Sequence, residues 1–258
     1  MKVVILCGGR GTRIQGVEDG VPKPMIPVGD RPILWHVMKC YMRYGFNEFV
    51  LALGYKQETI RDWFLHFYEY TEDLVKVYNM YTSFPQLPYT EENRFSVALV
   101  DTGLDTMTGG RVRRIEKWIG EDEDFMLTYG DGVGNVNVKD LVEWHKSHGK
   151  ILTITGVRPP GRFGELEYEK EFGLVTGFNE KSQTTKGRIN GGFMVCRRGI
   201  FEYLGEDDVL EGLPMLDLVA DKEVMVYRHN GFWQCMDTPR DYEMLNKMAR
   251  EEVSPWEE

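Results

Sequence analysis

Short apolar runs alternate with amphipathic segments along the first 157 residues, and this alternation is the feature that most constrains the fold. Residues 2–6, KVVIL, are almost continuously apolar, which is typical of a strand buried on both faces. The two patterns together predict strands at 2–6, 48–53, 95–101, 125–129 and 151–157, and helices at 32–44, 56–70, 111–119 and 138–148. This order predicts βαβ units, and therefore a Rossmann-like α/β fold with a mostly parallel sheet and helices on both faces.

The pattern changes after about residue 158. Short strands are predicted at 165–168, 174–178 and 190–196, where glycine and charged residues interrupt the apolar runs, and a closing helix is predicted at 238–252. We therefore expect a smaller, more antiparallel part that caps the sheet. A length of 258 residues with 42% hydrophobic residues suits one domain spanning 1–258, with a first half at 1–157 and a second half at 158–258.

Residues 71–94 interrupt the alternation of strands and helices. The segment contains two prolines and several aromatic residues, and its apolar side chains follow no clear period. A connection of this length is uncommon inside a compact domain, unless it is a functional loop or an arm that packs on a neighbouring subunit. The aromatic content favours the arm, so we expect a homo-oligomer.

The overall charge and the cysteines limit the function classes. The formal net charge is −10, which disfavours a nucleic-acid-binding protein, because such proteins are normally basic. No apolar run reaches membrane-spanning length, and no signal peptide precedes the first strand, so no membrane association is expected. The four cysteines, at positions 7, 40, 196 and 235, show no C-x-x-C spacing, which predicts reduced thiols in a cytoplasmic protein.

A glycine-rich stretch, LCGGRGTR, follows the first strand at residues 6–13. A turn of this kind lets backbone N–H groups point at phosphate oxygens, and Arg13 adds a cation. Lys23 lies between two prolines, which fix the backbone and present the ammonium at low entropic cost. A cation held near a phosphate loop suits transfer to a nucleotide phosphate. A glycine-rich turn without a ligand is the alternative for the loop alone.

Two better-known phosphate loops do not match this stretch. The chain contains no G-x-x-x-x-G-K-[ST] string, which excludes a P-loop. The dinucleotide pattern G-x-G-x-x-G fails at Ile14, and no acidic residue ends a second strand about twenty residues further on, so a dehydrogenase is disfavoured.

The chain resembles the nucleotide-sugar pyrophosphorylases, also called sugar-phosphate nucleotidyltransferases, over nearly its whole length. The segments that carry the resemblance are GGRGTR, PKPM, RPILWHVMK, VDTG with MTGGR, TYGDGV, HKSHGK, PPGRFG, INGGF and GFWQCMDTPRD. The resemblance implies a GT-A-like fold, a homo-oligomer (trimer or hexamer), and a second half that binds the sugar. Within the family, the segments are most similar to members that use CTP and glucose 1-phosphate, which implies formation of CDP-glucose and pyrophosphate.

The family motifs also imply roles for individual residues. Those implied to bind the nucleotide and its phosphates are Leu6, Gly8, Gly9, Gly11, Thr12, Arg13, Lys23, Thr106, Arg111 and Gly130. Those implied to face the sugar phosphate are Gly164, Glu180, Lys181 and Asn190. Arg13, Lys23 and Asp131 are the implied catalytic residues, and Asp131 and Asp237 are the implied metal ligands. Two carboxylates with phosphate oxygens suit a hard cation, so the expected cofactor is Mg²⁺.

Several alternatives remain open at this point. The same family includes enzymes that use UTP, dTTP or another sugar or polyol phosphate, and a non-catalytic nucleotide-binding module on this fold is a further hypothesis. His145 and His148 lie three apart on a predicted helix, but the apolar stripe beside them favours a structural role over a metal pair. Asp237 could instead cap the helix that follows it, because a cap and a metal ligand compete for the same oxygens.

Overall fold

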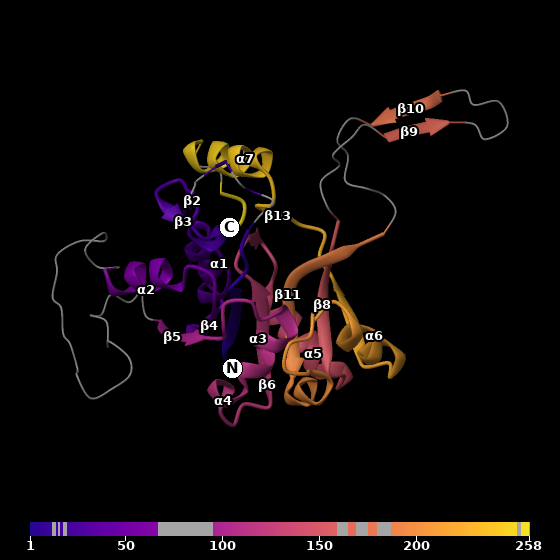
Figure 1. Cartoon of the computed structure of the whole chain (residues 1–258). Helices are drawn as coiled ribbons and strands as arrows, with labels where there is room; N and C mark the ends of the chain where they lie inside the picture. Colours follow the sequence, from indigo (N-terminus) through magenta and orange to yellow (C-terminus); the bar gives the residue numbers. More distant parts are fainter. Residues whose placement is uncertain are drawn as a thin grey trace.

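The structure is a computed structural model that describes residues 1–11, 14, 16–17, 20–66, 95–158, 165–168, 175–179, 187–251 and 254–257 (Figure 1). Its centre is a seven-stranded sheet in the order β12-β8-β11-β6-β1-β4-β5. Helices cover both faces of this sheet, as the alternating pattern predicts, and the fold class is confirmed.

The first half of the chain supplies the parallel part of the sheet. These strands are β1 (Val3–Cys7), β4 (Glu48–Leu53), β5 (Ser96–Asp101) and β6 (Asp124–Tyr129). β1 lies between β4 and β6 and is parallel to both, and β5 is parallel to β4. The carboxyl ends of all four strands therefore meet at one edge of the sheet, where open α/β sheets bind their ligands.

Three further strands continue the same sheet. They are β8 (Leu152–Val157), at the end of the first half, and β11 (Ile189–Arg197) and β12 (Val224–Arg228) of the second half. β11 is antiparallel to both β6 and β8, and β12 is parallel to β8. The second half therefore extends the sheet rather than only capping it. The antiparallel pairs outside the sheet are short: β9 (Glu165–Tyr168) with β10 (Val175–Asn179), β7 (Gly132–Gly134) with β13 (Trp233–Cys235), and β2 (Pro27–Val28) with β3 (Arg31–Pro32).

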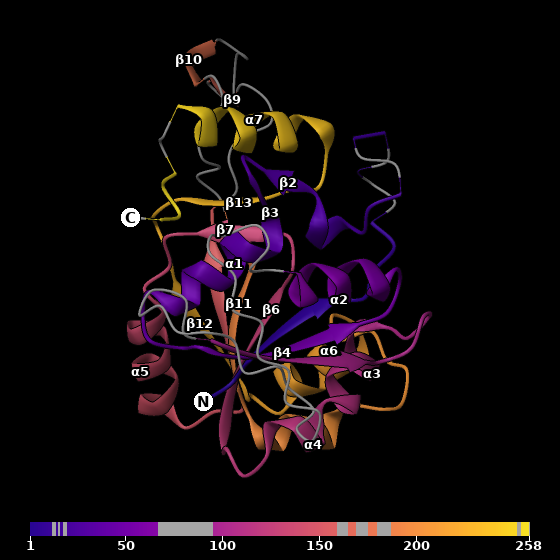
Figure 2. The ribbon, with the colours of Figure 1, turned by 90° about the vertical axis from the view of Figure 1, so that its left-hand side faces the viewer.

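Two hydrophobic clusters fill the two faces of the sheet, because alternate residues of β1 point to opposite sides. Val3 and Ile5 pack with α1 (Ile33–Met42), α2 (Gln57–Leu65), α5 (Val138–His148) and α7 (Pro239–Arg250). Val4 and Leu6 pack with α3 (Thr108–Arg114), α4 (Glu116–Ile119), α6 (Leu213–Ala220) and the 3₁₀ segment η5 (Arg198–Tyr203). α7 lies beyond the carboxyl edge of the sheet, next to the β2–β3 pair (Figure 2).

The helix predicted at 111–119 begins earlier and is broken. Thr108 opens α3, and the chain turns at Ile115, whose N–H bonds back to the Val112 carbonyl, before α4 begins. The helix predicted at 56–70 ends at Leu65; the rest of that prediction and the expected arm at 71–94 lie outside the described residues. Within the ranges described above, none of the helices has the length and apolar character needed to cross a membrane.

Candidate active site

The glycine loop leaves β1 at the carboxyl edge of the sheet. Gly11 has a φ of +62°, which favours glycine, and a Cβ there would lie 3.0 Å from the Cβ of Lys23. Gly9 faces open space, since a Cβ at that position would meet nothing within 4 Å. Gly130, which follows β6, donates its N–H to the carbonyl of Leu6 at 3.2 Å. Thr12 and Arg13 lie outside the described residues.

Arg111 lies beneath this loop and is almost fully buried, with 4% of its surface exposed. Its guanidinium donates to five acceptors at 2.7–3.1 Å, namely the carbonyls of Gly8, Leu53, Gly103 and Leu104 and the hydroxyl of Thr102. Burial lowers the pKa of Arg111, and the nearby charge of Arg114 lowers it further. These hydrogen bonds direct the guanidinium of Arg111 toward protein acceptors, and its assignment to the nucleotide stays a prediction.

Gly8 passes close to the guanidinium of Arg111. A Cβ at position 8 would lie 2.2 Å from the guanidinium carbon, so any larger residue there would require Arg111 to shift away from its five acceptors. The neighbouring arginines point elsewhere: Arg113 donates to the Phe201 carbonyl at 2.6 Å, and Arg114 donates to the Thr106 hydroxyl at 2.7 Å.

Lys23 connects the two carboxylates that the sequence analysis predicts as metal ligands. It opens a 3₁₀ turn, η2 (Lys23–Met25), and its Nζ donates to Asp131 Oδ2 and, at 2.5 Å, to Asp237 Oδ1. Its side chain is 10% exposed. Burial lowers the pKa of Lys23, but the two carboxylates outweigh burial, so the pKa is raised and the ammonium stays charged.

The short β7–β13 pair explains how two residues 106 positions apart in sequence meet, since Asp131 directly precedes β7 and Asp237 follows β13 by two residues. The N–H of Met236 donates to the carbonyl of Asp131 at 2.9 Å, which extends this pairing. Thr238, not Asp237, caps α7, in a capping box with Asp241. The helix cap therefore does not compete for the carboxylate of Asp237.

The donor set fits a hard divalent cation only in part. Asp131 and Asp237 supply oxygen ligands of the kind that Mg²⁺ prefers. Among the described residues, no group of three or more His, Cys, Asp or Glu side chains could hold a metal ion.

The sugar side of the site is described only in part. Asn190 in β11 is exposed, and its Nδ2 donates to the hydroxyl of Tyr129 at 3.4 Å, beside Asp131. Gly164, Glu180 and Lys181 lie outside the described residues. Of the four residues predicted to face the sugar phosphate, Asn190 alone can therefore be placed at this edge of the sheet.

Two contacts at this edge were not predicted. The hydroxyl of Tyr129 donates to Glu211, and Arg10 of the glycine loop pairs with Asp105 at 2.7 Å. Tyr129 stands in the TYGDG motif, which was a usable signal. Glu211 lies in a stretch between predicted elements and carried no signal in the sequence.

His145 and His148 pack as structural residues, as expected. Nδ1 of His145 and Nε2 of His148 both contact the hydroxyl of Thr153, at 2.8 and 2.9 Å. His36 contacts the carbonyl of Val28 at 2.9 Å and is buried. All four cysteines are free.

Comparison with known proteins shows the family of this chain. The nucleotidyl transferase family matches residues 2–238. A probable glucose-1-phosphate cytidylyltransferase of Bacillus subtilis is 41% identical over 258 residues, covering 99% of both chains. Glucose-1-phosphate cytidylyltransferase of Salmonella typhi is 38% identical over 257 residues, covering 99% of this chain and 98% of the relative. The crystal structure of HddC from Yersinia pseudotuberculosis complexed with GMP-PN has a TM-score of 0.68 and 25% identity, covering 96% of this chain and 99% of that one. With a family match over most of its length and full-length relatives of this kind, the chain belongs to the nucleotidyl transferase family.

Proposed function

We propose that this protein is an enzyme that transfers a cytidylyl group from CTP to glucose 1-phosphate, which yields CDP-glucose and pyrophosphate. The observation that carries the proposal is the 38–41% identity, over 98–99% of each chain, to proteins named as glucose-1-phosphate cytidylyltransferases. The cluster of Lys23, Asp131 and Asp237 at the carboxyl edge of the sheet supports it, since nucleotidyl transfer needs fixed charge at that place.

The glycine loop would bind the nucleotide. Backbone N–H groups of a glycine-rich turn can approach phosphate oxygens closely, and Gly9 leaves open space on that side. The residues assigned to the nucleotide are Leu6, Gly8, Gly9, Gly11, Thr12, Arg13, Lys23, Thr106, Arg111 and Gly130. Arg111 would serve this site through the loop that it holds, since its five hydrogen bonds go to protein acceptors.

In the proposed reaction, a phosphate oxygen of glucose 1-phosphate attacks the α-phosphorus of CTP in line. The bond from that phosphorus to the bridging oxygen breaks, and pyrophosphate leaves with the bonding electrons. Lys23 and Arg13 would hold the triphosphate in place and stabilise the charge that develops on it. Gly164, Glu180, Lys181 and Asn190 are assigned to the sugar phosphate on family grounds.

Asp131 and Asp237 would hold the divalent cation that the family typically uses, and we propose Mg²⁺. Their oxygen atoms fit a hard cation, with the remaining ligands coming from the substrate. A bound Mg²⁺ would neutralise charge on the triphosphate and orient it. Excess chelator is expected to abolish turnover, and added Mg²⁺ to restore it.

Pyrophosphate release tests the proposal. The protein is incubated with Mg²⁺, glucose 1-phosphate and each of CTP, UTP, dTTP, GTP and ATP in turn. Release with CTP alone supports the proposal, and release with another nucleotide keeps the chemistry but changes the substrate. GTP is included because mannose-1-phosphate guanylyltransferases are more distant relatives, at 24–28% identity.

If every nucleotide gives no release, other sugar and polyol phosphates are tested with CTP held fixed. Continued absence of turnover in a protein that still binds CTP would favour the non-catalytic alternative. We also propose that the protein is a homo-oligomer, either a trimer or a hexamer, and that residues 1–258 form one domain.

A further inference from the structure

The ring of Tyr129 is held by an irregular stretch of β11. The pairing of β11 with β8 shifts register between Asn190 and Met194, and Gly192 within that stretch has a φ of +79°. A Cβ on Gly192 would lie 2.7 Å from the ring atom Cδ2 of Tyr129, so the strand is shaped around the ring. Because Tyr129 is the last residue of β6, this contact fixes a side chain directly beside Asp131.

The hydroxyl of Tyr129 has two partners. It donates to Glu211 Oε1, and it accepts from Asn190 Nδ2 at 3.4 Å. Tyr129 therefore links Glu211 to Asn190, one of the four residues assigned to the sugar phosphate.

The other oxygen of Glu211 reaches the nucleotide side. Glu211 Oε2 accepts from the hydroxyl of Thr108 at 2.7 Å, and the same hydroxyl accepts from the N–H of Leu210 at 2.9 Å. Thr108 opens α3 and lies between Thr106 and Arg111, two residues assigned to the nucleotide. One carboxylate thus joins the carboxyl end of β6 to the start of α3.

The loop that carries Glu211 is fixed against α3. Asp207 Oδ1 accepts from the N–H of Met107 at 2.7 Å, and the carbonyl of Asp208 accepts from the N–H of Gly110 at 3.1 Å. A Cβ on Gly110 would lie 2.5 Å from the carbonyl oxygen of Glu206, so the two backbones are in close contact. Glu211 is exposed, but the loop holds it in one place.

We propose that Glu211 is a positioning residue that fixes Tyr129 and Thr108 relative to each other, and so couples the sugar-phosphate side of the site to the nucleotide side. The inference rests on the proposed function for the identity of the two ligands. Glu211 touches neither ligand in this assignment, and it acts through the two hydroxyl groups that donate to its carboxylate.

Four variants of the full chain test the coupling. Tyr129→Phe removes the hydroxyl on the sugar side, Thr108→Val removes the hydroxyl on the nucleotide side, and Glu211→Ala removes the link. Glu211→Gln is the conservative variant, because its amide can accept from one hydroxyl and donate to the oxygen of the other. Glu206→Ala, five residues earlier in the same loop, is the matched control that removes an exposed carboxylate.

Each variant is measured by steady-state kinetics and by calorimetric titration with CTP alone and glucose 1-phosphate alone. We expect Tyr129→Phe to raise the KM and Kd for glucose 1-phosphate and Thr108→Val to raise those for CTP, each about five- to tenfold, the range expected for the loss of one ordinary hydrogen bond. Glu211→Ala is expected to raise the KM and Kd for both ligands by about the same factors. The kcat is expected to change less than about twofold, because Lys23 and Asp131 stay in place. Glu211→Gln is expected to recover most of both affinities.

Wild-type affinities for both ligands in Glu211→Ala would overturn the inference, as would an equal loss in Glu206→Ala. A general loss of folding in Glu211→Ala would appear as a lowered melting temperature that Glu211→Gln shares, and this too would contradict a positioning role. The proposed function fails separately: a wild-type protein that binds CTP without releasing pyrophosphate would contradict catalysis, while the titrations would still test Glu211. A wild-type protein that binds neither ligand would contradict both.

Discussion

At the scale of single residues, Lys23 is the side chain whose role depends most on its charge. Its ammonium is the shared hydrogen-bond donor to Asp131 and Asp237, and it is held by a turn between two prolines. Sequence reasoning could predict the presentation of this lysine, because the prolines are local. It could not predict that the two carboxylates would both accept from it, since that depends on the pairing of β7 with β13.

Replacement of this lysine tests its role. Lys23→Ala is expected to lower turnover by about 10²–10³, the usual cost of removing one preorganised charge from a site of this kind. The measurement is the steady-state rate of pyrophosphate release, with circular dichroism to verify folding. Lys139→Ala, on the exposed surface of α5, is the matched control and should keep the wild-type rate. Near-normal turnover in Lys23→Ala would remove the lysine from the mechanism.

Gly8 and Gly9 are neighbours in the glycine loop with different structural requirements. A Cβ on Gly8 would overlap the guanidinium of Arg111 at 2.2 Å, whereas a Cβ on Gly9 would meet nothing within 4 Å. Gly8→Ala is expected to lower the free energy of unfolding by about 1–3 kcal/mol, the usual cost of overpacking, and Gly9→Ala by less than about 0.5 kcal/mol. Urea denaturation of the two variants measures the difference. Equal stability of both would show that Arg111 can move away without cost.

At the scale of elements, local signals predicted the regular parts well. The bounds predicted for β4 and α5 agree with the structure, because both elements carry strong local signals. Asn137 caps the first turn of α5, and Gly149, with a φ of +68°, ends it. α6 and β12 were not predicted. Three apolar residues of α6, Leu213, Leu216 and Val219, are 56–70% exposed, so its pattern does not show which face is buried.

The sequence predicted which residues form the candidate site, but not all of their contacts. Motifs read from the sequence indicated Lys23, Asp131 and Asp237, and the structure brings these three together. The direction of Arg111 could not be predicted, because it depends on carbonyl groups at the ends of other strands, such as those of Gly8 and Leu53. The contacts of Glu211 could not be predicted either, because they depend on how the 205–212 loop packs on α3. Periodicity and motifs describe neighbours in sequence, whereas these contacts join residues about 100 positions apart.

Packing of α5 on the sheet makes stability depend on pH through His145. Burial lowers the pKa of His145 from 6.5 to about 4; the charges of His148 and Arg197 lower it as well, and Asp124 only partly opposes them. The unfolded chain therefore binds a proton between about pH 6.5 and pH 4 that the folded protein does not, so stability falls as the pH falls through this window. Above about pH 6.5 this contribution is fully present.

Substitution of this histidine gives the check. His145→Gln is expected to lose stability at neutral pH, because the packing around Thr153 changes, but to lose less than the wild type does on acidification. The urea midpoint of each protein is measured at about pH 7.5 and about pH 4.5, and the fall between the two pH values is compared between wild type and variant. His148 also has a pKa lowered by burial, so the slope of the variant should be reduced and not abolished. An identical slope in both proteins would contradict the assignment to His145.

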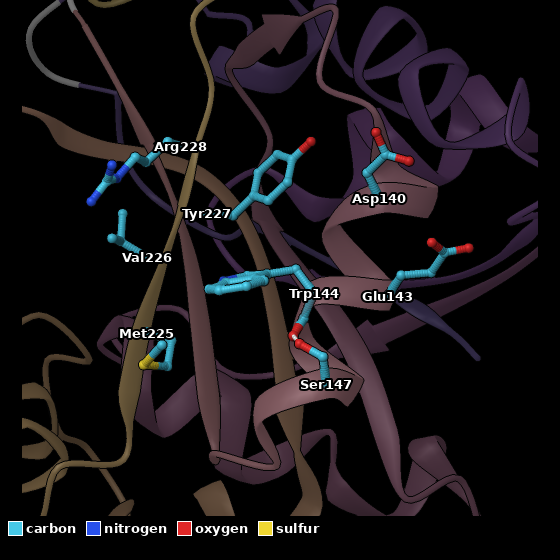
Figure 3. Close-up of a pocket in the computed structure, with 8 residues that line it drawn as sticks. All are labelled: Asp140, Glu143, Trp144, Ser147, Met225, Val226, Tyr227 and Arg228. Carbon is cyan, nitrogen blue, oxygen red and sulfur yellow. Dashed lines mark hydrogen bonds between the residues drawn. The ribbon is translucent and has the colours of Figure 1, made fainter.

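At the scale of the whole molecule, the edge of the sheet at β12 is the surface that suits association. β12 lies at one edge of the seven-stranded sheet. A groove of about 850 Å³ lies between β12 and α5. Figure 3 shows Trp144 reaching from α5 toward the strand, with Tyr227 beside Asp140 at the other end of the groove. Val226 on the strand is 45% exposed, and no proline or inward-pointing charge interrupts β12. Edge strands in natural proteins usually contain a proline or an inward-pointing charge, or are covered by another segment.

The predicted homo-oligomer can therefore be tested at two surfaces by sedimentation equilibrium. A monomer has a mass of 29.9 kDa, and we expect the wild type to sediment as a multiple of it. Val226→Lys places a charge on the β12 edge, and Phe84→Asp places one in the 71–94 segment whose aromatic content motivated the prediction. Dissociation by Phe84→Asp alone would assign the contact to the segment, and dissociation by Val226→Lys alone would assign it to the sheet edge. If each substitution alone dissociates the oligomer, the contact uses both surfaces, as expected when the β12 edge of one subunit packs on the 71–94 segment of the next. Such a head-to-tail contact closes into a ring only at particular rotations. A wild-type protein that sediments only as a monomer would contradict the prediction, and the apolar edge of β12 would then be solvent-exposed in the working enzyme.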